Sequence, residues 1–188
     1  PLATFAMETY KEDDCKEFLP KLSGGAAAMD EKTQRLTSQM HKAIAVIQFK
    51  LESQLFKKHP EWKMKDRCLF DHIDYRKGKV EIDGKEYDMT SCHFPTIDPD
   101  NPDKLSEEEE ILIQKLHHSF MVCEKLHKHI NVMLQHGCMY AIFNNNLLFH
   151  ASCPLNEDGS LKEVEIYPGK KFSGRALMHH TGMQIRTA

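Results

Sequence analysis

Residues 145–154 read Asn145-Asn146-Leu147-Leu148-Phe149-His150-Ala151-Ser152-Cys153-Pro154. A short apolar run ends at His150, and a turn of small residues follows. The run predicts a β-strand, and ligands often bind where the strands of an open sheet end. Because imidazole is the commonest neutral metal ligand, His150 is a candidate metal ligand. The alternative interpretation is a histidine that merely closes a hairpin.

The sequence before this strand predicts two long helices. Apolar residues at steps of three and four predict a helix over residues 31–58. Ser106 and Glu109 form a capping-box pattern, which begins a second long helix that Gly137 ends. A shorter helix is expected over residues 5–18.

The remaining segments predict turns and short strands. Residues 80–87 predict a β-hairpin, because Asp83-Gly84 suits a tight turn with positive φ angles. Residues 139–149 predict two strands around Asn144-Asn145-Asn146. Three further predictions complete the chain: a strand over residues 163–167, a turn over 169–172 and a helix over 173–188. The expected fold class is therefore α+β, with two long helices and β-hairpins.

Composition narrows the class of protein. The chain has 25 basic and 28 acidic residues and a net charge of −3, which argues against a nucleic-acid-binding surface. No apolar run has the length of a membrane span, and no secretory signal is present. The six cysteines contain no Cys-x-x-Cys pair and read as reduced thiols, which predicts a cytoplasmic location. The chain starts with Pro1 and stops in a predicted helix, so we expect an interior segment of a longer protein.

Several passages resemble one family of bacterial enzymes. They are residues 1–10, 40–54, 93–99, 119–120, 124–130 and 154–163. Together, these passages resemble the class 3 fructose-1,6-bisphosphatases of Firmicutes and related bacteria. The resemblance runs in order along the chain, from Pro1 to about Met178. These enzymes belong to the calcineurin-like metallophosphoesterase superfamily.

The resemblance implies an activity and a cofactor for the parent protein. It implies hydrolysis of the 1-phosphate of fructose 1,6-bisphosphate, in gluconeogenesis, by two-metal activation of water with Mn²⁺. His150 resembles a metal-ligating histidine of the superfamily, although Ala151 stands where glycine is usual. The other ligand motifs of the superfamily are absent from the sequence. We therefore expect the isolated chain to be inactive.

The resemblance also implies a fold and a division of the chain. The parent would contain an α/β metallophosphoesterase sandwich with a helical insertion. Residues 1–30 would be a helix and a flexible loop, and residues 31–137 the mostly helical insertion with one hairpin. Residues 138–188 would be strands that return to the phosphoesterase core, followed by the start of a helix.

Four cationic residues are candidates for binding the sugar bisphosphate. Lys170, Lys171 and Arg175 surround the start of the last predicted helix, where a helix N-terminus attracts anions. Ordinary turn chemistry explains them equally well. The planar guanidinium of Arg67 suits a sugar phosphate. The expected partners are this small molecule and further copies of the chain in a homo-oligomer, with neither nucleic acid nor membrane.

Two alternatives stay open at this point. The chain can be a non-catalytic regulatory or oligomerisation module, because long amphipathic helices also bury faces against partners. It can also belong to a phosphoesterase with another substrate. Among the other histidines, those near the second long helix read as solvated surface.

Overall fold

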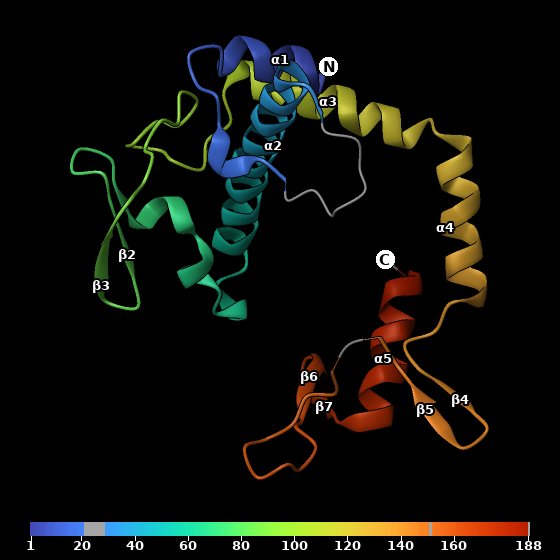
Figure 1. The fold of residues 1–188 in the computed structure, drawn as a ribbon. Helices are drawn as coiled ribbons and strands as arrows, with labels where there is room; N and C mark the ends of the chain where they lie inside the picture. The colour runs from blue at the N-terminus through green and yellow to red at the C-terminus, as the bar shows by residue number, and fades with distance from the viewer. Residues whose placement is uncertain (21–28, 151, 188) are drawn as a thin grey trace. The chain divides into compact units, whose positions relative to one another are not determined.

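The computed structural model describes residues 1–20, 29–150 and 152–187, which form two compact units, residues 1–121 and 122–188. Figure 1 labels the elements of both units. The small-residue loop predicted at residues 23–28 lies outside the described residues.

The first unit is built on one long helix. Helix α2 spans Glu31–Lys58, the bounds that the apolar periodicity predicts. It begins after Asp30, whose carboxylate accepts a hydrogen bond from the Thr33 N–H at 3.0 Å. Lys57 and Lys58 lie in its last turn, where positive charge complements the helix dipole.

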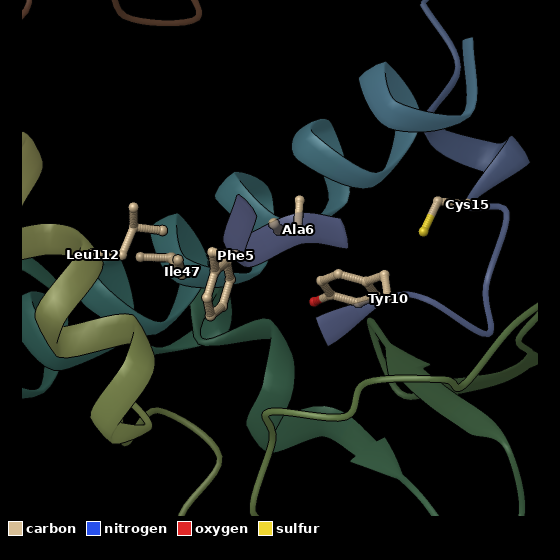
Figure 2. Close-up of a cluster of buried hydrophobic side chains, with 7 residues drawn as sticks. Phe5, Ala6, Tyr10, Cys15, Ile47 and Leu112 are labelled. Atoms are coloured by element: carbon tan, nitrogen blue, oxygen red, sulfur yellow. The ribbon is translucent and has the colours of Figure 1, made fainter. Parts of the chain in front are cut away.

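Helices α1 (Leu2–Thr9) and α3 (Glu107–Met121) complete the core of this unit with α2. Figure 2 shows Phe5 of α1 beside Ile47 of α2. The buried cluster consists of Phe5, Ala6, Tyr10, Cys15, Ala43, Ile47 and Leu112. It draws residues from three segments that are distant in the sequence, so it joins the N-terminal helix to α2 and α3.

The predicted helix over residues 5–18 is wrong in its length. Helix α1 ends at Thr9, and a single 3₁₀ turn, η1, follows at Lys16–Phe18. The Asp13 carboxylate accepts a hydrogen bond from the Cys15 N–H at 2.8 Å, and Cys15 has a left-handed φ of 52°. Aspartate side chains that bond nearby backbone groups compete with helical hydrogen bonding, which explains the interruption.

Short elements follow α2 in the first unit. They are the 3₁₀ turns η2 (Pro60–Trp62), η3 (Lys65–Arg67) and η4 (Leu69–His72) and the strands β1 (Ile73–Asp74), β2 (Lys79–Ile82) and β3 (Lys85–Asp88). The strands form an antiparallel sheet in the order β1-β2-β3. Asp83 and Gly84 both have positive φ in the β2–β3 turn, which confirms the predicted hairpin.

The second unit contains two helices and two hairpins. They are α4 (Glu124–His136), β4 (Ala141–Phe143) paired with β5 (Asn146–Leu148), β6 (Val164–Tyr167) paired with β7 (Lys170–Phe172), and α5 (Gly174–Thr187). Asn144 and Asn145 have positive φ in the β4–β5 turn, as the asparagine run predicts. Residues 170–172 form strand β7 and correct the prediction of a turn over 169–172, because Phe172 pairs with Val164.

The second long helix of the prediction is two helices. Helix α3 ends at Met121, and α4 begins after Cys123, whose backbone is extended. The capping box is confirmed: the Glu109 N–H donates to the Ser106 hydroxyl at 3.2 Å, and the Ser106 N–H donates to the Glu109 carboxylate at 2.8 Å. Gly137 follows the end of α4, and a side chain there would collide with the Met133 carbonyl.

The described residues thus form helices and small antiparallel sheets, an α+β arrangement as predicted. Within them, no helix combines the length and the apolar character needed to cross a bilayer. The expected sandwich concerns the whole enzyme and stays a prediction, as does the three-part division at residues 30 and 137.

Candidate functional site

His150 lies two residues after strand β5 with an exposed side chain. It lines a cavity of about 520 Å³ in the second unit. The same cavity is lined by Val164 and Ile166 of β6 and by Leu177 and Met178 of α5. One imidazole, from a residue just after a strand, therefore lines a mostly apolar cavity.

The described residues do not assemble a metal site by themselves. Among them, no three side chains of histidine, cysteine, aspartate or glutamate gather in a way that could hold an ion. A two-metal centre needs several such ligands. His150 fits such a centre only as one ligand, with the others supplied from outside these residues.

Arg175 lies in the first turn of α5 and is bound within the second unit. Its Nε donates a hydrogen bond to the Tyr140 hydroxyl at 2.8 Å, and its guanidinium lies 5.9 Å from the centre of the Tyr140 ring. Arg175 lines an apolar cavity of about 370 Å³ between the β4–β5 hairpin and α5. This cavity and the one beside His150 share the lining residues Phe149 and Met178. His150 and Arg175 therefore lie on adjoining cavities.

Lys170 and Lys171 lie side by side on strand β7, and both are exposed. Consecutive strand residues point to opposite faces, so only one of them can face the same side as Arg175. Lys171 pairs in register with Glu165 of β6, which places a carboxylate opposite this lysine. The geometry of β7 therefore argues against a phosphate site formed jointly by Lys170, Lys171 and Arg175.

Arg67 lies in η3 of the first unit and is exposed. The other four candidates lie in the second unit, and the placement of one unit relative to the other is not determined.

The main polar cluster of the first unit was not predicted from the sequence. Lys42 of α2 is almost fully buried, and its ammonium donates to the Asp13 carboxylate at 2.7 Å. His93 Nδ1 lies 3.0 Å from the same carboxylate. Burial alone would raise the pKa of Asp13, but the hydrogen bonds from Lys42, the Cys15 N–H and His93 hold this pKa well below its usual range.

Three aromatic rings complete the surroundings of Lys42. Its ammonium lies 5.5 Å from the ring centres of Tyr10 and Phe94 and 5.8 Å from that of Phe18. Burial and the nearby charge of Asp13 raise the pKa of the Cys15 thiol to about 12, so this thiol is inert rather than nucleophilic. The cluster ties three segments together and offers no reactive group.

A second buried lysine lies two turns further along α2. Lys50 donates to the Glu109 carboxylate at 2.7 Å and to the Thr96 carbonyl at 2.5 Å, and both charged side chains are fully enclosed. Because Glu109 also caps α3, this pair connects the start of α3 to α2. The one signal in the sequence is the position of Lys50 within the apolar stripe of α2, which indicates a buried lysine but not its partner.

The sequence matches one known family along its whole length. The family is described as Firmicute fructose-1,6-bisphosphatase, and the match covers residues 1–188. Relatives named "Fructose-1,6-bisphosphatase class 3" include a protein of Parabacteroides distasonis, 52% identical over 188 residues, and one of Bacteroides thetaiotaomicron, 49% identical over 188 residues. In both, the whole of this chain is covered.

A similarly named protein of Clostridium novyi is 49% identical over 178 residues, which is 95% of this chain and 26% of that protein. The chain spans 28% of the length of the Parabacteroides and Bacteroides relatives. No solved structure matches it. Since the family match extends over every residue, the chain belongs to the Firmicute fructose-1,6-bisphosphatase family.

Proposed function

We propose that this chain is one part of a fructose-1,6-bisphosphatase that hydrolyses the 1-phosphate of fructose 1,6-bisphosphate to fructose 6-phosphate and phosphate. The observation that carries the proposal is the family match over all 188 residues. The relatives of that name are several times longer than this chain. The described residues therefore supply a portion of the active enzyme, and the isolated chain is inactive.

His150 is the residue of this chain that we assign to the catalytic centre. Its imidazole follows a strand, is exposed, and has no clustered ligand partners among the described residues. It acts as one neutral ligand of a divalent-metal site, with Mn²⁺ as the preferred ion. Such a centre, when occupied, supplies an activated water and neutralises charge on the phosphate.

The cationic candidates have a separate role in binding substrate. Arg175 is held by Tyr140 and lines the hollow that adjoins the one beside His150, which makes it the candidate for a phosphate contact in this unit. A guanidinium donates paired hydrogen bonds to phosphate oxygens. Lys170 or Lys171 adds positive charge from β7. Arg67 is a further candidate from the first unit.

A phosphate-release assay of the complete protein with fructose 1,6-bisphosphate and Mn²⁺ tests the proposal. We expect His150→Ala to lower kcat more than about 100-fold and to reduce the bound metal, while circular dichroism stays unchanged. His129→Ala removes another exposed histidine, on α4, and is the matched control.

The outcomes separate the competing functions. If the His150→Ala variant kept its turnover and its full metal content, His150 would be a residue that merely closes a hairpin. Turnover of other phosphate esters but not of fructose 1,6-bisphosphate would indicate a phosphoesterase with another substrate. A complete protein without any phosphatase activity would favour a regulatory or oligomerisation module.

A further inference from the structure

Arg186 lies in the last turn of α5, and its guanidinium holds the end of α4. Its Nε donates a hydrogen bond to the Leu134 carbonyl at 3.2 Å, and its Nη2 donates to the Gly137 carbonyl. Its Nη1 donates to the Gly182 carbonyl of its own helix at 2.7 Å. The last carbonyls of a helix lack partners within that helix, and positive charge beside them complements the helix dipole. Arg186 therefore satisfies the end of α4 from a separate helix.

The link from α4 to strand β4, residues 137–140, lies against α5 (Figure 1). Gly182 permits a close approach, because a Cβ at this position would lie 3.2 Å from the Met139 side chain. Nearer the start of α5, Arg175 donates to the Tyr140 hydroxyl at 2.8 Å. Helix α5 therefore holds this link at several points.

The 137–140 link also borders the candidate metal ligand. Cys138 and Met139 line the cavity of about 520 Å³ that His150 lines. The carbonyl at the start of the link, which Arg186 holds, directly precedes these two residues. A metal ligand must keep its position to within about 0.5 Å, and the surrounding packing and hydrogen bonds supply that precision. The link therefore connects the guanidinium with the surroundings of His150.

Arginine is the residue type that suits these acceptors. Its planar guanidinium donates hydrogen bonds in several directions at once, and here three nitrogens serve three carbonyls. A lysine ammonium would keep the charge but not this fixed geometry. The Arg186→Lys change therefore separates the effect of the positive charge from the effect of the position that the guanidinium imposes.

We propose that Arg186 is a positioning residue of the enzyme, which fixes the 137–140 link and, through it, the wall of the cavity beside His150. Its guanidinium is bound to backbone carbonyls, so it acts through the link and not on the substrate. This inference rests on the proposed function, because it takes His150 as a metal ligand of the complete enzyme. A purely structural Arg186 would stabilise α4 without any effect on the metal centre.

Mn²⁺ binding and phosphate release by the complete protein test the inference. We expect Arg186→Ala to weaken Mn²⁺ binding, measured from the electron paramagnetic resonance signal of free Mn²⁺, and to lower kcat, each by about 10-fold or more. The KM for fructose 1,6-bisphosphate should stay within about 2-fold, because no substrate contact is removed. Arg186→Lys should give intermediate values. Arg35→Ala is the matched control: it removes an exposed arginine that donates to the Lys11 carbonyl in the first unit, and it should change none of these quantities.

The outcomes keep the inference and the proposed function apart. Arg186→Lys carries the test if Arg186→Ala fails to fold. Unchanged kcat and Mn²⁺ affinity in the folded variants, even with a lower melting temperature, would overturn the inference and leave the proposed function intact. An equal loss of Mn²⁺ affinity in Arg35→Ala would also overturn it.

An unmodified protein that binds Mn²⁺ but releases no phosphate from fructose 1,6-bisphosphate would contradict the proposed function. Weaker Mn²⁺ binding by the Arg186 variants of that protein would still support the inference.

Discussion

At the scale of single residues, the first unit depends on two buried lysines whose carboxylate partners no local pattern reveals. Lys42 and Lys50 lie eight residues apart on α2, and each pairs with a carboxylate from a distant segment. Their partners, Asp13 and Glu109, are 29 and 59 residues away in the sequence. An apolar stripe predicts a helix, but it cannot show that a lysine on that helix faces a carboxylate inside the fold.

The Lys50–Glu109 pair gives a stability prediction. Lys50→Met or Glu109→Gln alone leaves one buried charge unpaired and should lower the free energy of unfolding by about 3 to 5 kcal/mol. The double variant should lose less than the sum of the two, because neither charge remains. Urea unfolding followed by the fluorescence of Trp62, the only tryptophan, reports on the first unit.

The exposed Lys16–Asp14 pair is the control for this experiment, and Lys16→Met should leave the unfolding curve unchanged. Single variants at Lys50 or Glu109 that unfold at the same urea concentration as the unmodified chain would contradict the buried-pair interpretation.

Asp13 gives a prediction on pH. Its folded-state pKa lies below the value of about 3.9 for an unfolded aspartate, so the ionised carboxylate stabilises the fold above that pH. This stabilisation is lost as the pH falls below about 4 toward the folded-state pKa. The difference in free energy of unfolding between the unmodified chain and Asp13→Asn should therefore be constant above pH 5 and shrink below pH 4. An equal difference at pH 3 and pH 7 would disprove this role, and Glu12→Gln, at an exposed carboxylate, is the control.

At the scale of elements, the sequence predicted the features that interactions within a few residues determine. The bounds of α2, the capping box of α3 and the two hairpin turns follow from periodicity, capping and positive φ, all of which act within a few residues. The break at Cys123 could not be predicted, because neither glycine nor proline marks it. Strand β7 was missed for a similar reason: its three residues become a strand only by pairing with β6.

Helix α2 also yields a prediction about packing. Ile47 is buried between α1 and α3, so Ile47→Ala should lower the free energy of unfolding by about 2 to 5 kcal/mol. Leu55→Ala lies two turns further on the same helix, where the residue is 45% exposed, and should cost less than about 1 kcal/mol. Similar losses at both positions in urea unfolding would contradict the core assigned to the first unit.

At the scale of the whole molecule, the candidate site could be predicted only in part. His150 is a candidate because an apolar run places it after a strand, and its role as a metal ligand stays a prediction. The contact between Arg175 and Tyr140 joins residues 35 positions apart, and no spacing rule indicates it. The further ligands that the proposed metal centre would need have no signal in these residues, because a two-metal site collects its ligands from several segments.

The last prediction concerns the 188-residue chain by itself. Without the remaining polypeptide of the enzyme, the uncharged β4–β5 hairpin should pair with copies of itself, and sedimentation at micromolar concentration should show dimers or larger species. Phe143→Lys places a charge on the exposed face and should shift the chain toward monomer. Ile82→Lys adds the same charge to the exposed β2–β3 hairpin and should change nothing. A compact monomer whose sedimentation is independent of concentration would mean that the hairpin is already covered within these residues.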